Sequence, residues 1–272
     1  MSSLSCPVEQ PKIYQVGGSV RDLLLGRKAH DIDYAVEISS FAALEKWIES
    51  VQGQVLHKKP EFGSIKVRWS GSDFKAAAGK SERSERSSTS KVYDFTTCRT
   101  DGKYTDGRHP DMVAIGTIEQ DLKRRDFTIN ALAVPCIFNA KTTTIEPMVT
   151  PSNVTTSSHN ILDLTGGLQD LKEGKLKCVG LTRDRFYEDS IRLLRAMRFS
   201  ITMDLKLDSD IVSAFEDAEL ISRLDLVSRE RILDEINKCF ACSTLKTIQF
   251  LESHVILREY LFTKKKVLLK CC

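Results

Sequence analysis

The sequence predicts an α+β protein in which a small mixed β-sheet head is followed by an all-α region. Residues 12–138 alternate short β-like and helical segments, and after about residue 163 the apolar residues recur with a helical period. Two polar stretches of low complexity, 70–90 and 139–162, interrupt this pattern. We therefore expect a head at 12–138 that carries an insert at 70–90, a linking insert at 139–162 and a helical region at 163–272.

The elements of the head follow from local patterns. Short β-like runs predict strands at 12–17, 31–38, 64–69 and 91–97, and a helical turn that leads into a further strand at 128–138. A short helix at 19–26 is closed by Gly26. An amphipathic helix is expected at 41–52, with an apolar face formed by Phe41, Leu44, Trp47, Ile48 and Val51. Residues 70–90 are expected to be the solvated loop of a hairpin.

The helical region is predicted from period-3.6 apolarity in four segments, which are 184–202, 208–221, 228–240 and 243–254. Leu193, Leu194, Met197 and Ile201 fall on one side of the first of these helices. Its other side carries Asp189 and several arginines, and like charges at this spacing lower helix stability unless an anion faces them. This helix is therefore a candidate binding surface, with a solvated basic face as the alternative.

Composition and charge exclude several classes of protein. With 272 residues, of which 41% are hydrophobic and 28% charged, the chain is not wholly disordered. No apolar run reaches the roughly 18 residues of a membrane span. The net charge of +3 favours nucleic acid only weakly. Between residues 172 and 200, however, there are eight Lys and Arg residues but only four Asp and Glu residues. This local excess of positive charge is stronger evidence for a polyanionic partner.

The eight cysteines form no recognisable disulfide framework, and the N-terminus has no secretory signal. We therefore expect reduced thiols and an intracellular protein, with the cytoplasm as the first choice and the mitochondrion or nucleus still open. Cys239 and Cys242 form a CxxC inside an expected helix. A zinc site is not expected there, because no second ligand pair matches them.

Gly17 and Gly18 close the first expected strand and open the first helix. Free N–H groups and the helix dipole favour a phosphate at such a position, and glycines let the backbone approach it closely. Arg21 can add a bidentate phosphate contact. Gly18 and Arg21 are therefore candidate phosphate ligands, and a tight turn with a surface arginine is the alternative.

Asp31 and Asp33 lie two residues apart on an expected strand, so their side chains should share one face. Adjacent carboxylates repel each other unless a cation lies between them, and hard oxygen ligands select Mg²⁺ or a related ion. Two such ions would activate an attacking oxygen and stabilise a leaving oxygen in a phosphoryl displacement. Asp94, on a neighbouring expected strand, is the candidate third catalytic carboxylate. Ordinary solvated aspartates are the alternative.

Together these motifs resemble a known family. GGSVRD at 17–22 with DID at 31–33 is similar to the polymerase-β superfamily of nucleotidyltransferases, and more narrowly to class II tRNA nucleotidyltransferases (CCA-adding enzymes) and related bacterial poly(A) polymerases. RRDFTINALAV from Arg124 matches the family motif RRDxxxNA, and FYEDSIRLLRAMRF from Phe186 matches EDxxRxxRAxRF. DLTGGLQDL from Asp163, SRERILDEI from Ser228 and the segment from Arg99 resemble three further family segments, of which SRERILDEI mainly stabilises the helical neck.

The resemblance implies a template-independent nucleotidyltransferase that adds C and A from CTP and ATP to the 3′ end of tRNA and releases pyrophosphate. It implies Mg²⁺ as cofactor, held by Asp31 and Asp33, and base selection by Asp189 and Arg192. Arg195 and Arg198 would extend the anion-binding surface. The full set of implied nucleotide-binding residues is Gly18, Arg21, Arg125, Asp189, Arg192, Arg195 and Arg198.

Two alternatives to CCA addition stay open. The first is a poly(A) polymerase that uses ATP only, and the second is a truncated, inactive RNA-binding fragment. Family members usually continue well beyond residue 272 into helical domains that grip tRNA, so the tRNA affinity of this chain is in question. CC-only and A-only addition are also open, and the sequence indicates no oligomeric state.

Overall fold

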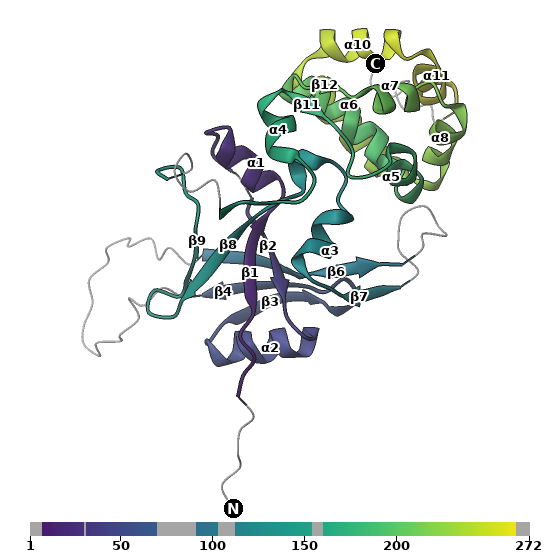
Figure 1. The fold of residues 1–272 in the computed structure, drawn as a ribbon. Helices are drawn as coiled ribbons and strands as arrows, with labels where there is room; N and C mark the ends of the chain where they lie inside the picture. The colour runs from purple at the N-terminus through teal and green to yellow at the C-terminus, as the bar shows by residue number, and fades with distance from the viewer. Residues whose placement is uncertain (1–6, 30, 70–90, 103–111, 154–159, 265–272) are drawn as a thin grey trace, which may run out of the picture. The chain divides into compact units, whose positions relative to one another are not determined.

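The structure is a computed structural model that describes residues 7–29, 31–69, 91–102, 112–153 and 160–264. The chain divides into two compact units (Figure 1). We call Met1–Thr100, Ala114–Leu122 and Leu132–Leu162 the sheet unit, and Asp101–Val113, Lys123–Ala131 and Asp163–Cys272 the helical unit. The predicted α+β class is confirmed. Residues 123–131 group with the helical unit, although the sequence pattern assigned them to the head.

One mixed sheet forms the frame of the sheet unit. Its strands are β1 (Lys12–Val16), β2 (Asp33–Glu37), β3 (Gln54–Lys59), β4 (Ser64–Trp69), β5 (Lys91–Thr97), β8 (Leu132–Asn139), β9 (Thr144–Pro147) and the short edge strand β10 (Leu162–Asp163). They follow the order β10-β8-β1-β2-β5-β4-β3, with β9 also paired to β8. The β2–β5 pairing is parallel, and the pairings of β1 with β2 and β8, of β4 with β3 and β5, and of β8 with β9 are antiparallel. The predicted hairpin of β4 and β5 is confirmed, and its connection at 70–90 lies outside the described residues.

Among the strands of four or more residues, β3 and β9 were not predicted. All six residues of β3 are exposed, so it has no apolar alternation to reveal it. β9 lies inside the stretch 139–162, which the sequence analysis took for a low-complexity insert. Its single buried apolar residue, Ile145, enters the core, while its backbone pairs with β8. One apolar residue among polar neighbours gives no period, so only the pairing with β8 identifies this strand.

Helix α2 (Phe41–Ser50) packs on the sheet and closes the core of this unit (Figure 1). Its first turn is capped by the Ser40 hydroxyl, which accepts a hydrogen bond from the Ala43 N–H at 3.0 Å. The predicted apolar face is confirmed, since Leu44, Trp47 and Ile48 are buried. Trp47 meets the ring of Trp69 edge-on at 6.2 Å. The helix thereby holds β4 in place, and β4 borders the site described below. The other helices here are α1 (Gly18–Leu24) and α3 (Ile118–Lys123).

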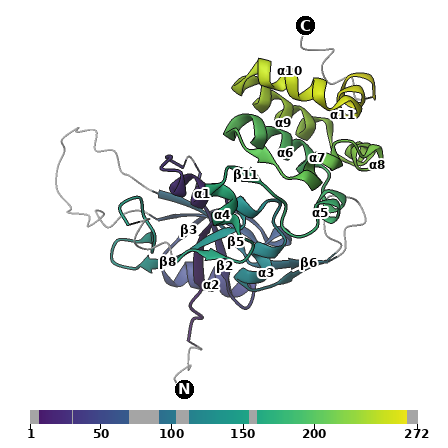
Figure 2. The ribbon, with the colours of Figure 1, turned by 45° about the horizontal axis from the view of Figure 1, so that its top comes forward.

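The helical unit contains short helices around two longer ones. The helices are α4 (Gly167–Lys172), α5 (Thr182–Glu188), α6 (Ile191–Met203), α7 (Ser209–Ala214), α8 (Ala218–Ser222), α9 (Arg229–Cys242), α10 (Thr244–Ser253) and α11 (Val255–Glu259). Among the described residues, two further pairs of short strands are β6 (Arg99–Asp101) with β7 (Val113–Ile115), and β11 (Lys175–Leu176) with β12 (Lys206–Leu207). Figure 2 shows α6, α9 and α10 packed against one another. The predicted apolar side of α6 is buried. No helix within the described ranges is both long and apolar enough to span a membrane.

Two of the predicted helices are each broken in two. The segment 184–202 forms α5 and α6, and Asp189 lies between them in an extended conformation with φ −143° and ψ 101°. The segment 208–221 forms α7 and α8, and the Asp217 carboxylate caps α8 by accepting hydrogen bonds from the Glu219 and Leu220 N–H groups. Short acidic side chains offer backbone N–H groups a partner outside the helix. Apolar periodicity continues across both breaks and does not reveal them.

Candidate active site

Three aspartates that the sequence analysis selected line one cavity of about 880 Å³ in the sheet unit. Asp33 is the first residue of β2 and lies directly opposite Asp94 of the parallel strand β5. Opposed residues of paired strands project from the same face of a sheet. Asp31 lines the same cavity. The fold therefore brings together Asp31, Asp33 and Asp94, as the sequence analysis expected.

Asp31 reaches the cavity by a different route from the predicted one. It was expected on the strand with Asp33, but β2 begins only at Asp33 and Asp31 lies in a bend before it. Both residues are exposed. The bend therefore replaces strand alternation as the reason that the two carboxylates lie in one cavity.

Lys66 is a cavity residue that the sequence analysis missed. It lies opposite Asp94 across the antiparallel pair β4 and β5, and its Nζ is 2.9 Å from Asp94 Oδ2. The hydrogen bond and charge of Asp94 raise the pKa of Lys66, with smaller contributions from the charges of Asp31 and Asp33. The available signal was the alternation of SIKVRW, in which Ile65 and Val67 are buried and Lys66 faces the other way. Without the strand register, that position is simply an exposed lysine.

The donor chemistry of this cavity fits a divalent cation. Carboxylate oxygens are the hard ligands that Mg²⁺ prefers. Across the described part of the chain, no three His, Cys, Asp or Glu side chains are already arranged to hold a metal ion. Asp94 is instead engaged by Lys66. Asp31 and Asp33 supply further carboxylate oxygens in the same cavity.

The predicted glycine turn connects β1 to α1. Gly17 has φ 73° and ψ −139°, a backbone conformation that only glycine adopts without strain. A Cβ on Gly18 would lie 3.2 Å from Nη2 of Arg21, so a glycine at position 18 leaves room for that guanidinium. Arg21 donates from Nε and Nη2 to Asp22 Oδ1 at 2.9 and 2.8 Å. Neither Gly18 nor Arg21 lines the aspartate cavity.

The RRDFTINA motif forms a compact turn in the helical unit. Arg124 pairs with Asp101 at 3.3 Å, and Arg125 donates from Nη1 to the carbonyl of Asn130 at 3.4 Å. Asp126 Oδ1 accepts hydrogen bonds from the Phe127 N–H at 2.8 Å and from Asn130 Nδ2 at 3.2 Å. The family resemblance implied that Arg125 binds the nucleotide. The contacts seen here are those of a turn closed around Asp126.

Asp126 is also the partner of Arg195 on α6. The Arg195 Nε and Nη2 atoms donate to Asp126 Oδ2 at 2.8 and 2.6 Å. Burial by itself would raise the pKa of Asp126, but the charge and hydrogen bonds of Arg195, with help from Asn130, outweigh burial and lower that pKa to about 2. The pair joins the RRDFTINA turn to α6.

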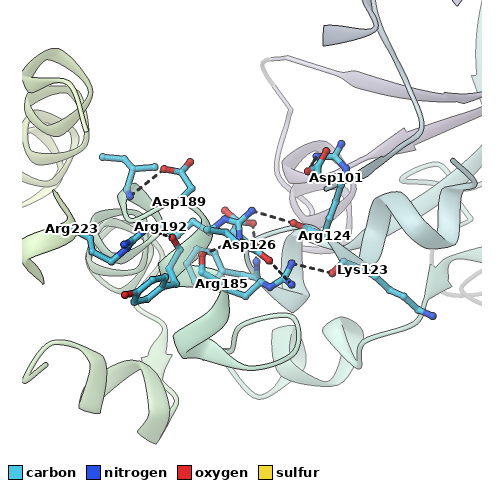
Figure 3. Close-up of polar contacts among 12 residues, drawn as sticks. Asp101, Lys123, Arg124, Asp126, Arg185, Asp189, Arg192 and Arg223 are labelled. Carbon is cyan, nitrogen blue, oxygen red and sulfur yellow. Dashed lines mark hydrogen bonds and ion pairs between the residues drawn. The ribbon is translucent and has the colours of Figure 1, made fainter. Parts of the chain in front are cut away.

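Asp189 and Arg192, the predicted base-reading pair, lie in a partly buried network rather than on an open helix face. Arg192 Nη1 donates to Glu188 at 2.7 Å and to the Arg185 carbonyl at 3.1 Å, while its Nη2 donates to the Arg124 carbonyl at 3.2 Å (Figure 3). The side chain of Arg192 is 12% exposed and that of Asp189 is 18% exposed. The network fixes the Arg192 guanidinium before any ligand arrives.

Asp189 accepts a hydrogen bond from a residue of another helix. Arg231 of α9 donates from Nη2 to Asp189 Oδ2 at 3.1 Å. Arg231 belongs to the segment SRERILDEI, for which the sequence analysis expected only a stabilising role. Because Arg231 lies 42 residues from Asp189 in the chain, local pattern could not reveal this contact.

Arg195 and Arg198 were expected to extend an anion-binding surface, but their contacts are internal. Arg198 Nε donates to Glu235 Oε2 at 2.5 Å, and its guanidinium lies 4.2 Å from the centre of the Phe199 ring. Glu235 is buried on α9, and Asp126 neutralises Arg195 in the same way. In this structure, the anions that face Arg195 and Arg198 are therefore supplied by the helical unit itself.

Comparison with known proteins agrees with these features. Residues 13–177 match the family model described as the poly A polymerase head domain. A CCA-adding enzyme of Lactococcus lactis subsp. cremoris (strain MG1363) is 38% identical over 226 residues, which are 83% of this chain and 45% of that protein. The chain thus spans about half the length of the curated relatives that it matches.

Solved structures show the same similarity. The Bacillus stearothermophilus CCA-adding enzyme in complex with CTP has a TM-score of 0.60 and 26% identity, over 89% of this chain and 47% of that one. The Thermotoga maritima CCA-adding enzyme complexed with tRNA has a TM-score of 0.61 and 27% identity, over 93% of this chain and 49% of that one.

Proposed function

The chain belongs to the poly A polymerase head-domain family, and from that premise we propose that it is a template-independent nucleotidyltransferase acting on the 3′ end of tRNA. It adds C and A from CTP and ATP. The observation that carries this proposal is the cavity that Asp31, Asp33 and Asp94 line together, because clustered carboxylates can hold the metal ions that assist an in-line phosphoryl displacement. The names of the CCA-adding relatives support the choice of tRNA as acceptor.

In the proposed reaction the terminal ribose 3′-oxygen attacks the α-phosphorus of the incoming nucleotide. A bond forms between that oxygen and phosphorus, the bond from phosphorus to the oxygen that bridges to the β-phosphate breaks, pyrophosphate leaves and the hydroxyl proton passes to solvent water. Asp31 and Asp33 would hold Mg²⁺, which when bound stabilises the charge on the attacking and leaving oxygens. Asp94 would complete the carboxylate set.

The remaining residues would position the nucleotide. We propose Gly18, Arg21 and Arg125 as contacts to its phosphates, and Asp189 with Arg192 as the readers of its base. Arg192 is already oriented by Glu188 and by two carbonyls, so little side-chain entropy is lost when it meets a base edge. Arg195 and Arg198 would hold α6 in place behind this pair. We also propose a cytoplasmic setting, which the free thiols of the described cysteines support.

The deciding experiment uses tRNA that ends before CCA and offers labelled CTP, ATP or both. Two C additions followed by one A are expected when both nucleotides are present. A long tract made from ATP alone would support a poly(A) polymerase instead. RNA binding without incorporation of either nucleotide would leave only an RNA-binding fragment. Oligomeric state would be read from the same preparation by light scattering.

Asp189→Ala and Arg192→Ala are each expected to reduce discrimination against UTP and GTP by about 10- to 100-fold. A hydrogen bond to a charged group contributes about 1.5–3 kcal/mol, and a site built on such bonds rejects a base that leaves them unpaired. Single-turnover incorporation of all four nucleotides measures this effect. Arg183→Ala serves as the control, because Arg183 on α5 forms only exposed pairs with Asp217 and Glu219. Unchanged preference for CTP and ATP in both variants would place base selection elsewhere.

A further inference from the structure

Three charged residues lie in one row across neighbouring strands of the sheet unit. Asp33 of β2 is opposite Asp94 of β5, and Asp94 is opposite Lys66 of β4. Directly opposed residues have their Cβ atoms about 5 Å apart and interact. All three residues line the same cavity. The sheet register therefore builds a row of two acids and one base at the wall of the proposed active site.

The pleat of β4 fixes the side on which Lys66 lies. Its neighbours Ile65 and Val67 are fully buried on the opposite face, so a shift of Lys66 to that face would expose both of them. Lys66 and Asp94 are 46% and 43% exposed, which leaves the lysine side chain free to move within the cavity. The strand register thus places Lys66 opposite Asp94, but the contact between Nζ and Oδ2 can still break and re-form.

The row has an electrostatic consequence for cation binding. Asp33 and Asp94 repel each other unless a cation compensates them, and the Lys66 ammonium supplies one positive charge. A divalent ion that enters the cavity meets that ammonium both as a like charge and as a competitor for Asp94. Removal of the lysine charge should therefore strengthen cation binding.

We propose that Lys66 is a built-in counter-cation of the aspartate cavity, which occupies Asp94 and competes with the divalent ion for it. Lys66 thereby raises the concentration of free Mg²⁺ that the site requires. This inference rests on the proposed function, because it assumes that the cavity binds a divalent cation.

The test is calorimetric titration of the full chain with Mn²⁺ and with Mg²⁺, without nucleotide. Lys66→Met and Lys66→Gln both remove the charge, and each is expected to lower the Kd of the ion by about two- to fivefold, which is the range of a partly exposed ion pair. Lys66→Arg keeps the charge and should retain the wild-type Kd. Lys58→Met is the matched control, since Lys58 lies on β3 of the same sheet, pairs with Glu45 of α2 at 2.6 Å and does not line the cavity.

The outcomes separate this inference from the proposed function. If the wild type binds the ion and both neutral variants bind it with the same or a higher Kd, Lys66 is only a surface ion pair and the inference is overturned. Tighter binding by Lys66→Arg or Lys58→Met would overturn it as well, because the cause would not be the charge at position 66. A wild type that binds neither ion overturns the metal assignment and this inference together. Tighter binding by the neutral variants supports the inference even if tRNA extension fails, which would count only against the proposed function.

Discussion

Asp33→Ala is expected to abolish nucleotide addition, with a loss of rate on the order of a thousandfold or more. The carboxylate is exposed in the cavity, so its removal takes away charge stabilisation at the reacting oxygens without opening the core. Single-turnover incorporation of CTP on tRNA that ends before CCA measures the loss. Thermal melting should change by no more than about 2 °C, since surface substitutions usually have small effects on stability.

Asp31→Ala is expected to behave in the same way. Glu45→Ala provides the control, because Glu45 is another acid of the sheet unit that lies outside the cavity lining. If either aspartate variant kept near-normal activity at ordinary Mg²⁺ concentrations, the metal assignment to this pair would have to be abandoned.

Asp126→Ala is expected to lower the free energy of unfolding by about 3 kcal/mol, because it leaves the Arg195 guanidinium without its partner in a largely buried site. The same substitution removes the acceptor for the Phe127 N–H and for Asn130. Urea denaturation of the full chain measures this loss. The comparison variant is Arg183→Ala, whose exposed pairs should contribute less than about 1 kcal/mol. Equal losses in the two variants would show that the Asp126 pair has no special role.

The same pair predicts how stability depends on pH. The folded-state pKa of Asp126 is lowered to about 2 from its ordinary value of 3.8. The stability that the ionised carboxylate contributes is therefore fully present above about pH 4 and is lost as the pH falls towards 2, because the unfolded chain takes up the proton first. The amide of Asp126→Asn does not titrate in this range. The difference in the free energy of unfolding between wild type and variant should therefore become smaller between pH 5 and pH 2.5. A constant gap would contradict the lowered pKa.

Local pattern was enough for most elements and for the choice of chemistry. The strands predicted at 64–69 and 91–97 match β4 and β5. Successive residues of a half-buried strand alternate between the core and solvent, so apolar and polar side chains alternate in the sequence. The apolar face of α2 was predicted for the same reason. Asp31 and Asp33 could be selected as metal ligands because carboxylates two residues apart repel each other unless a cation lies between them.

Other features have causes that are distant in the sequence. The strand β9 depends on β8 for its backbone partners, and Lys66 meets Asp94 only through the register of β4 and β5. The arginines of α6 illustrate the same limit. Their spacing indicated that an anion must face them, but not that Asp126 and Glu235 of the same chain supply it.

By itself, the sequence determined the α+β class, the strands β1, β2, β4, β5 and β8, the longer helices, and the aspartates proposed for catalysis. These properties depend on residues that are only a few positions apart in the chain, so periodicity and motif spacing are enough to predict them. Only the tertiary structure decided which charges are neutralised. It placed Lys66 on Asp94, Arg231 on Asp189 and Arg195 on Asp126. The energy of an ion pair depends on distance and burial in space, and residues far apart in the chain acquire both only when it folds.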